Sequence, residues 1–420
     1  MKVMVVGGGG REHAIIRKLK ENTSITELYA LPGNGGIARD AICVNIGAKD
    51  TPAQVAFAKE NGIDFAVVAP DDPLVLGAVD ALTEAGIPCF GPSKAAAQIE
   101  GSKVFSKNLM KKYGIPTASC EVFDNLEEAI AYVKAGTFPT VIKADGLALG
   151  KGVIIAQTEE EAIAALHSMM EDKVFGESGS RVVIEEFLTG PEVSVLAFTD
   201  GKTVKPMVSS MDHKRALDGD KGLNTGGMGT IAPNPYYTAD VADRCMQEIF
   251  LPTISAMREE GCPFKGCLYF GLMLTPNGPK VIEYNCRFGD PETQVVLPLL
   301  ESDLLTVMQA VTEERLADIE VKFSEGAACC VVMASEGYPS KYEKGFPLTM
   351  SEEARPHVFV AGAALKDGEV VTNGGRVLGV TAVEKDLAGA IKKAYARVSE
   401  VHFENAFYRH DIGKRAMEAK

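Results

Sequence analysis

The chain has 420 residues, of which 46% are hydrophobic and 24% charged, and its formal net charge is -14. This length predicts two to four domains and leaves ample chain for a buried core. The acidic balance excludes a general nucleic-acid surface, which requires lysine and arginine in excess, but it allows a local cationic pocket for a small anion.

The nine cysteines include no CxxC pair, and several lie inside apolar runs, which indicates buried, reduced thiols. The amino terminus passes directly into a strand and a glycine turn, without the apolar segment of a signal peptide. No apolar stretch approaches the roughly 20 residues that a membrane span requires. These features predict a cytoplasmic enzyme that binds neither nucleic acid nor membranes.

Short apolar runs alternate with amphipathic segments over residues 1–102, which predicts a doubly wound parallel sheet. The first turn, Gly7 to Gly10, is similar to the glycine turn of nucleotide-binding domains. It fails the dinucleotide fingerprint, because Glu12 stands where a third glycine is needed and PGN at Pro32 replaces the expected acid. NAD binding is therefore disfavoured, and the turn either binds phosphate or is purely structural.

A helix is expected from Glu100, because the apolar stripe of EGSKVFSKNLMKKYGIP ends at Gly114 with a proline beyond. Lys103 lies in its first turn, where a solvated surface lysine is the alternative to a ligand. Earlier, APDDPL and FGP each follow an apolar strand. Both are therefore placed at the carboxyl edge of the sheet, where open α/β sheets bind ligands.

A second α+β unit is predicted over residues 120–188, with the loop KADGLALGKGV between two apolar strands. This order differs from a Walker P-loop, because the glycines precede a strand and not a helix. A hairpin whose backbone N–H groups close on phosphates fits the order, and a loose structural loop is the alternative. The candidate phosphate-binding residues are Lys143, Gly146, Gly150, Lys151 and Gly152.

The segment RVVIEEFLTGPEV predicts two strands joined by a turn, a connection that can hold adenine through backbone donors and acceptors. An acid in such a segment takes the ribose hydroxyls, and Glu185, Leu188 and Glu192 have suitable spacing. A partly exposed edge strand explains the pattern equally well.

Residues from Met211 to Gly229 are polar and glycine-rich, with almost no secondary-structure signal, which predicts a long substrate loop. Within it, His213 is expected to be a polar loop residue and not a catalytic base. A helix follows, and the strand KGCLYFGLML then meets a TPNG turn, which predicts a hairpin. Two more helices close this unit near residue 318.

The second strand of that hairpin carries VIEYNCRFGDPETQ. Because side chains alternate along a strand, it has one polar face, made of Glu283, Asn285 and Arg287. The opposite face consists of Ile282, Tyr284 and Cys286. Mg²⁺ accepts carboxylate and amide oxygens beside substrate phosphates, and a neighbouring guanidinium binds an oxyanion. A charged surface strand is the alternative.

Eleven short motifs occur in a fixed order, and the last hundred residues add short strands, glycine turns and one packing helix. The motifs are GGREH at Gly9, PGN at Pro32, EGSK at Glu100, IKADGL at Ile142, GKGV at Gly150, EEFL at Glu185, DHKR at Asp212, NTGGMG at Asn224, RFGDPETQ at Arg287, TNGGRVL at Thr372 and RHDIGKRA at Arg409. Together they closely resemble the phosphoribosylamine–glycine ligase family of the ATP-grasp superfamily.

The resemblance implies an α/β and α+β multidomain ATP-grasp fold. Its expected parts are an amino-terminal doubly wound parallel-sheet domain (1–102), an ATP-grasp domain (103–325) with a lid subdomain at about 120–188, and a carboxyl-terminal β-rich domain (326–420). The implied reaction joins glycine to 5-phosphoribosylamine through glycyl phosphate, with ATP and Mg²⁺ or Mn²⁺ as cofactors, in de novo purine biosynthesis. A monomer or weak dimer is expected.

The resemblance also implies roles for individual residues. The catalytic group would comprise Arg287, Lys143, Asp212 and Lys214. The ATP-binding group would comprise Lys103, Lys143, Gly146, Gly150, Lys151, Gly152, Glu185, Glu186, Leu188 and Glu192. The substrate-binding group would comprise Gly8, Gly9, Gly10, Pro32, Gly33, Asn34, Asp212, Lys214, Asn224 and Arg287, and the metal ligands would be Glu283 and Asn285.

Several positions depart from the family pattern, namely Gly8 in place of Asn or Ser, Asp71 and Asp72 in a segment that usually carries Glu, Leu149 in place of a small residue, and Leu223 in place of Pro. The change at Gly8 removes a side-chain contact, so sugar binding there would depend on backbone N–H groups. A nucleotide-sensing protein with a retired ATP-grasp site is the rival hypothesis, which the intact Lys143, Glu283, Asn285 and Arg287 oppose.

Overall fold

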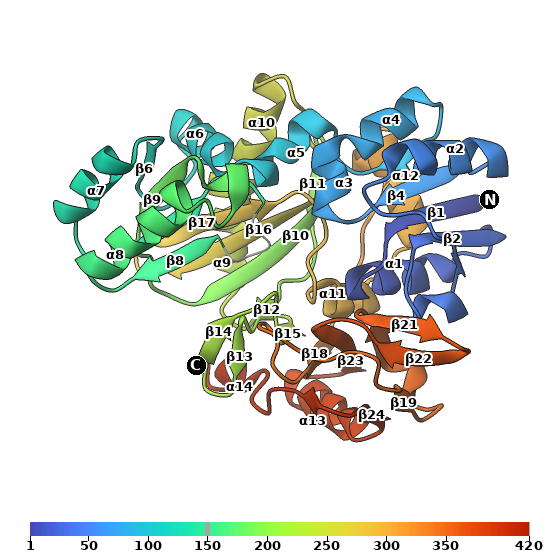
Figure 1. Cartoon of the computed structure of the whole chain (residues 1–420). Helices are drawn as coiled ribbons and strands as arrows, with labels where there is room; N and C mark the ends of the chain where they lie inside the picture. The colour runs from blue at the N-terminus through green and yellow to red at the C-terminus, as the bar shows by residue number, and fades with distance from the viewer. Residues whose placement is uncertain (148–151, 420) are drawn as a thin grey trace.

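The computed structural model describes residues 1–147 and 152–419 (Figure 1). The amino-terminal part is a parallel sheet in the order β3-β2-β1-β4-β5. Its strands are β1 (Lys2–Gly7), β2 (Glu27–Pro32), β3 (Ile42–Cys43), β4 (Phe65–Val68) and β5 (Cys89–Phe90), and its helices are α1 (Gly10–Lys20), α2 (Thr51–Asn61), α3 (Asp71–Leu76), α4 (Ala78–Glu84) and α5 (Lys94–Gly101). The predicted doubly wound parallel sheet is confirmed.

The helix predicted from Glu100 is two helices, because the chain breaks at Ser102 between α5 and α6 (Lys103–Tyr113). Ser102 has extended backbone, and its Oγ accepts a hydrogen bond from Phe105 N at 3.1 Å, which caps the new helix. The predicted end is confirmed, since Gly114 terminates α6 with φ +67°. The break places Lys103 at the first position of a helix.

The segment predicted to be the lid contains an antiparallel sheet in the order β6-β9-β7-β8. It consists of β6 (Cys120–Phe123), α7 (Leu126–Lys134), β7 (Thr140–Ala144), β8 (Val153–Ala156), α8 (Glu159–Leu166) and β9 (Val182–Glu186). Its buried residues, such as Ile142, Leu166 and Val182, form a cluster separate from the other cores. The lid therefore packs as a unit of its own, as Figure 1 shows.

A second antiparallel sheet, in the order β11-β10-β16-β17, lies at the centre of the molecule. It contains β10 (Glu192–Asp200), β11 (Val204–Pro206), β16 (Lys265–Thr275) and β17 (Gly278–Asn285), with α9 (Ala239–Cys245), α10 (Leu251–Glu259) and α12 (Leu304–Thr312). The predicted hairpin is confirmed by the pairing of Thr275 with Gly278. One buried cluster joins Met4 of the first sheet to Phe270 and Tyr284 of this one, so the two units share a core.

A β-bulge in β17 changes the alternation that the sequence predicts. Gly271 pairs with Glu283 and Leu272 with Val281, which leaves Ile282 without a partner residue. As a result, Val281 and Tyr284 both point into the core, and Ile282 lines a cavity beside Glu283. The predicted face of Ile282 is therefore wrong, whereas Tyr284 and Cys286 are buried as expected.

The third large sheet has the order β12-β15-β18-β23-β20, and β25 also pairs with β18. Its strands are β12 (Met211–Asp212), β15 (Gly229–Ala232), β18 (Ala327–Ser335), β20 (Val358–Val360), β23 (Arg376–Glu384) and β25 (Ala406–Phe407). Around it lie α11 (Thr293–Leu299), α13 (Leu387–Val398), α14 (Lys414–Met417) and the strand pairs β13 (Arg215–Leu217) with β14 (Lys221–Asn224), β19 (Thr349–Met350) with β24 (Val401–His402), and β21 (Ala363–Lys366) with β22 (Glu369–Thr372).

The prediction that residues 211–229 have almost no secondary structure is wrong. They contribute two strands to the third sheet and form a hairpin between them. The strand at Gly229 pairs with Val331, whose distance along the chain hides the pairing from local sequence patterns.

All nine cysteines are free, and all except Cys43 and Cys120 are buried, as predicted. Among the described residues, no helix has the length and apolar character needed to cross a membrane.

Candidate active site

Two lysines and one glutamate form a buried cluster where the lid sheet meets α6. Glu185 lies between them, with Oε2 at 3.0 Å from Lys143 Nζ and Oε1 at 3.2 Å from Lys107 Nζ. Lys107 also donates to Thr117 Oγ1 at 2.7 Å, and Lys143 donates to Ile282 O at 3.1 Å. Two cations against one carboxylate leave a net positive charge in a buried place, which suits the phosphates of a nucleotide.

Lys103 reaches the base of the predicted glycine loop and is not a freely solvated side chain. Its Nζ donates to Gly146 O at 2.8 Å, and burial lowers its pKa although Glu283 opposes this effect. At the other end of the loop, Gly152 O accepts a hydrogen bond from Ala144 N at 2.8 Å. Gly150 and Lys151, which were predicted to bind phosphate, and the departure at Leu149 lie outside the described residues.

Glu100, near the end of α5, holds three consecutive residues at the end of β17. Its Oε1 accepts from Arg287 Nη2 at 2.9 Å, and its Oε2 accepts from Cys286 N at 2.7 Å. We assign the Asn285 amide with its nitrogen toward Glu100 Oε1 at 3.1 Å and Tyr284 O at 3.2 Å, because an amide oxygen at that position would face only acceptors. Its carbonyl oxygen therefore faces away from the carboxylate and is free to bind a cation.

Arg287 retains a free donor in this arrangement. Its side chain is largely buried, and among the described residues its Nε has no hydrogen-bond partner. Burial works against the charge of Arg287, but Glu100 and Asp71 raise its pKa above the usual value. A buried guanidinium with an unused N–H is suited to an anion such as a carboxylate or phosphoryl group.

Glu192, Asp212, Lys214 and Glu283 line one small cavity together. Lys214 Nζ lies 3.8 Å from Glu192 Oε2 and 3.9 Å from Glu283 Oε1. Burial alone would lower the pKa of Lys214, but these two carboxylates raise it well above its usual value. Burial likewise opposes ionisation of Glu283, yet Lys214 and Lys143 lower its pKa. Lys214 is therefore cationic and Glu283 anionic at neutral pH.

Asp212 lies in the same cavity, but its pKa is shifted in the opposite direction to that of Glu283. Burial, reinforced by the charge of Glu292, raises its pKa well above the usual value. Its Oδ1 accepts a hydrogen bond from His213 N at 2.7 Å. A carboxylate with a raised pKa is a suitable proton acceptor in acid-base chemistry.

Glu283 and Asn285 fit a magnesium ion whose other ligands include phosphate oxygens. Glu283 is ionised, and the free Asn285 oxygen is a second hard donor on the same strand. Within residues 1–147 and 152–419, no group of three or more His, Cys, Asp or Glu side chains is placed to hold a metal. One carboxylate and one amide oxygen are a ligand number typical of Mg²⁺ sites that substrate phosphates and water complete.

The segment predicted to bind adenine runs from β9 into β10. Both carboxylate oxygens of Glu185 face lysines, so this side chain is not directed at a sugar. Glu186 Oε1 accepts from Lys280 Nζ at 2.9 Å and from Ser119 N at 3.0 Å. Leu188 is half-buried, and Glu192 is exposed.

The glycine turn and the PGN segment form one structure at the edge of the first sheet. Gly33 N donates to Gly7 O at 3.1 Å, and Asn34 Nδ2 donates to Gly8 O at 2.9 Å. A Cβ atom at Gly8 would lie only 2.3 Å from Gly33 O, so this chain has no room for a side chain there. The N–H of Gly9 is already bound to Glu12 Oε2 at 2.6 Å.

Asp290 connects this turn to three other motifs. Its Oδ2 accepts from Arg11 N at 3.2 Å, and its Oδ1 accepts from Gln294 Nε2 at 2.9 Å. Arg376 Nη1 donates to Asp290 O at 2.9 Å and to Gly227 O at 3.3 Å. The motifs GGREH, NTGGMG, RFGDPETQ and TNGGRVL therefore meet around Asp290 and Arg376.

Two residues of the DHKR to NTGGMG segment lie apart from this centre. His213 is buried, its Nδ1 lies 3.1 Å from Gly229 O, and its Nε2 accepts from Gly413 N at 3.0 Å. Burial lowers its pKa to about 4, so the ring is neutral and structural. His213 lies in the loop between β12 and β13, as predicted, but this loop residue is buried. Asn224 is exposed at the end of β14.

Sequence models of phosphoribosylglycinamide synthetase match the chain in three parts, which are the N domain over residues 1–100, the ATP-grasp (A) domain over 101–293 and the C domain over 328–415. The chain belongs to the phosphoribosylglycinamide synthetase family. The family is one of ATP-grasp ligases, and the predicted fold and enzyme class are confirmed.

Individual relatives agree with this assignment. A phosphoribosylamine–glycine ligase of Agrobacterium fabrum is 50% identical over 421 residues, which cover 99% of each chain. The crystal structure of phosphoribosylamine–glycine ligase from Thermotoga maritima matches with a TM-score of 0.87 and 36% identity over 98% of this chain and 100% of that one. The biotin carboxylase domain of Hydrogenobacter thermophilus 2-oxoglutarate carboxylase, solved with MgADP, shares the fold with a TM-score of 0.74 and 16% identity over 97% of this chain and 91% of that chain.

Four residues of this synthetase site were not assigned from the sequence, namely Glu100, Lys107, Asp290 and Arg376. Lys107 follows Lys103 by four residues, so the two lie on one face of α6, a spacing that also fits a solvated helix face. Glu100, Asp290 and Arg376 lie inside the family motifs, which was their only signal. Their roles depend on partners that are remote along the chain.

Proposed function

We propose that this chain joins glycine to 5-phosphoribosylamine and converts ATP to ADP and phosphate, with glycyl phosphate as the intermediate and glycinamide ribonucleotide as the product. Membership of the synthetase family over nearly the whole chain supports this reaction. The observation that carries it is the contact of Lys143 with Ile282 O at 3.1 Å. This contact sets the buried lysines beside the strand that bears Glu283 and Asn285.

The ATP phosphates would lie between Lys143, Lys103 and the loop that includes Gly146 and Gly152, with Gly150 and Lys151 completing it. Because Lys107 shares the Glu185 carboxylate, Lys143 is only partly neutralised and retains attraction for a phosphate. The segment from Glu186 to Leu188 would bind adenine through its backbone, and Glu192 would take the ribose hydroxyls.

Mg²⁺ would be held by Glu283 and Asn285, and Mn²⁺ is expected to replace it. When bound, the ion neutralises charge on the phosphates. The protein's own part is to keep Glu283 ionised and to turn the Asn285 oxygen toward the ion through Glu100.

In the first step, a glycine carboxylate oxygen would form a bond to the γ-phosphorus while the bond to the ADP oxygen breaks. Arg287 would hold the glycine carboxylate in line with that phosphorus. Its free Nε and its Glu100 contact, which fixes the guanidinium plane, support this role.

In the second step, the sugar amine would form the C–N bond at the acyl carbon while the bond from that carbon to the phosphate oxygen breaks. The attacking nitrogen must lose a proton, and Asp212, whose pKa is raised, would accept it. Lys214 would offset the negative charge of the departing phosphate.

Phosphoribosylamine would bind at the first sheet, between the turn of Gly8, Gly9 and Gly10 and the segment of Pro32, Gly33 and Asn34. Helix α1 begins at Gly10, and a helix N-terminus favours a phosphate group. Asn224 would close over the sugar from the hairpin of β13 and β14.

We further propose domains at residues 1–102, 103–325 and 326–420, with the lid at about 120–188. The strands β12 and β15, which lie within the second range, complete the sheet of the third and tie these two domains together. The chain would act in the cytoplasm on small-molecule substrates as a monomer or weak dimer.

The reaction is tested by ADP release from ATP and Mg²⁺ with glycine, phosphoribosylamine, both or neither. Turnover is expected only with both substrates, and mass spectrometry should detect glycinamide ribonucleotide. Alanine in place of glycine and ammonia in place of the sugar amine serve as controls. Turnover that needs only one substrate would contradict the proposed ligation.

A further inference from the structure

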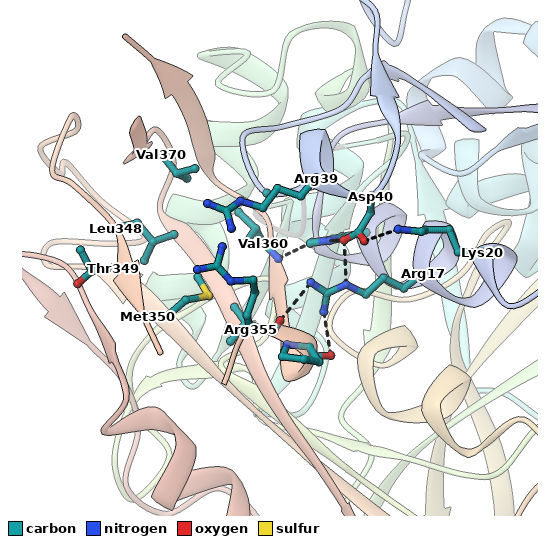
Figure 2. A pocket seen from close by; sticks show the side chains of 14 residues that line it. Arg17, Lys20, Arg39, Asp40, Leu348, Thr349, Met350, Arg355, Val360 and Val370 are labelled. Atoms are coloured by element: carbon teal, nitrogen blue, oxygen red, sulfur yellow. Dashed lines mark hydrogen bonds and ion pairs between the residues drawn. The ribbon is translucent and has the colours of Figure 1, made fainter. Parts of the chain in front are cut away.

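A cavity of about 660 Å³ lies between the amino-terminal unit and the carboxyl-terminal sheet. Figure 2 shows it, with α1 and the segment after β2 on one side and the segments around β19, β20 and β22 on the other. None of its lining residues is among those proposed for ATP, glycine, phosphoribosylamine or the metal. The cavity therefore has lining residues of its own, although it adjoins the site described above at Asn34, which is hydrogen-bonded to Val360 O and Gly36 N. Its size is that of a small-molecule pocket.

Part of the pocket wall is a closed polar network around Asp40. Its carboxylate lies 2.9 Å from His13 Nε2, 3.1 Å from Arg17 Nε and 2.9 Å from Lys20 Nζ. Arg17 also donates to Pro356 O at 3.0 Å and to Arg355 O at 3.2 Å. These groups have partners, so their role is to join the two units.

Two other arginines in the same pocket, Arg39 and Arg355, are not held by a network of this kind. The side chain of Arg39 makes no hydrogen bond or ion pair with any described residue and is exposed toward the cavity. Among the residues that the structure describes, the buried Nε of Arg355 has no partner, and its only ion pair is with Glu352 at 2.5 Å, whose side chain is 81% exposed. An exposed ion pair of this kind contributes little to stability. In Figure 2 the two guanidinium groups point toward each other from opposite sides of the pocket.

The rest of the wall is apolar apart from Thr349. Leu348, Met350 and Val370 lie beside the two arginines in Figure 2. Two available guanidinium groups next to an apolar wall are complementary to a molecule with an anionic group at one end and an apolar body at the other. The net charge of -14 on the chain repels large polyanions, which favours a small ligand.

We propose that this pocket binds a small organic anion whose phosphate or carboxylate lies between Arg39 and Arg355 and whose apolar body covers Leu348, Met350 and Val370. This binding site is additional to the proposed ligase reaction and does not depend on it. The ligand would contact both units that Arg17 and Asp40 hold together.

The proposal is tested by calorimetric titration of the full chain, with saturating MgADP present to fill the nucleotide site. The probes are 1-naphthyl phosphate, 1-naphthoate, inorganic phosphate and 1-naphthol, which separate the two anionic groups from the apolar body. We expect one molecule of naphthyl phosphate or naphthoate per chain, at least tenfold tighter than inorganic phosphate or naphthol. The tighter of the two arms identifies the anionic group.

The variants are Arg39→Gln, Arg355→Gln and the double variant, with Arg315→Gln as a matched surface control because Arg315 pairs with exposed Glu313. Each single change should weaken the aromatic anion at least fivefold, and the control should not change it. Arg39→Gln alone keeps the test decisive if Arg355→Gln fails to fold, since the Arg39 side chain has no partner to lose. Absence of binding, binding that both changes leave intact, or equal binding of inorganic phosphate would overturn the proposal.

Discussion

Two buried glutamates organise the candidate active site from opposite sides, and they differ in what they hold. Glu185 lies between the cations of Lys107 and Lys143, whereas Glu100 binds one guanidinium, one backbone N–H and one side-chain amide. The first arrangement leaves positive charge for phosphates. The arrangement at Glu100 fixes the direction of the Asn285 amide oxygen and of the free Nε–H of Arg287. One carboxylate therefore sets charge, and the other sets orientation.

The largest effect is expected from Glu283→Gln, which removes the ionised ligand beside the group that Glu100 orients. We expect kcat to fall roughly 10³-fold, because a charge that acts on the reacting phosphates is lost while the side-chain volume is kept. ADP release at increasing Mg²⁺ measures this, and thermal unfolding checks the fold. Glu320→Gln, at an exposed pair with Lys322, is the control. Near-normal turnover at ordinary Mg²⁺ would remove Glu283 from the metal site.

Glu185→Gln tests whether this carboxylate sets charge. Two buried lysines would lose their shared partner, so we expect roughly 3–5 kcal/mol of destabilisation in urea unfolding.

Glu314→Gln is the matched control for that change, because Glu314 also pairs with two lysines, Lys202 and Lys265, but at the surface. It should cost less than about 1 kcal/mol. Equal losses in the two variants would contradict a special role for the buried cluster.

Glu100→Gln tests whether the second carboxylate sets orientation. The new amide can donate to the Asn285 oxygen and turn it from the metal, so we expect Mg²⁺ affinity and kcat to fall by about 10- to 100-fold. Mn²⁺ binding measured by electron paramagnetic resonance reports the affinity without turnover.

The pH dependence of this variant separates orientation from stability. Burial raises the pKa of Glu100 although Arg287 opposes it, so the wild-type carboxylate protonates at a higher pH than usual as the solution is acidified. Asp212, the proposed base, also has a raised pKa and contributes to the acid limb of kcat/KM, so Glu100→Gln should remove one of two ionisations from that limb. An unchanged acid limb would assign it to another group.

The smallest expected effect is on the pH dependence of stability, and it comes from the buried imidazole rings of His13 and His213. Burial lowers the pKa of each from 6.5 to about 4. The unfolded chain takes up these protons near pH 6.5 and the folded chain only near pH 4, so stability is full above 6.5 and falls as the pH drops toward 4.

Near pH 5.5 the loss should be about 1 kcal/mol for each ring, measured by urea unfolding against a sample at pH 8. His213→Gln should reduce the slope of stability against pH relative to wild type. A slope that is the same in wild type and His213→Gln would show that this ring is not the titrating group.

Local pattern was sufficient for most of the fold. The alternation of apolar strands and amphipathic helices predicted the parallel sheet, and the TPNG turn predicted the hairpin of β16 and β17. Pattern failed at Ile282, where a bulge reverses the alternation, and at Met211 to Gly229, where β12 pairs with β15 and β15 pairs with β18. In both places the partner strand, and not the local sequence, decides the structure.

By itself, the sequence determined which chemical groups are present, because strand alternation and motif order identify residues such as Lys143, Glu283 and Arg287. Only the tertiary structure decided what those groups can do. Glu185 was expected to meet a sugar, but its carboxylate lies between two lysines, and Glu100 of helix α5 sets the orientation of Asn285 at the end of strand β17. Charge and hydrogen bonding act over a few ångströms in space, and residues far apart along the chain supply the partners.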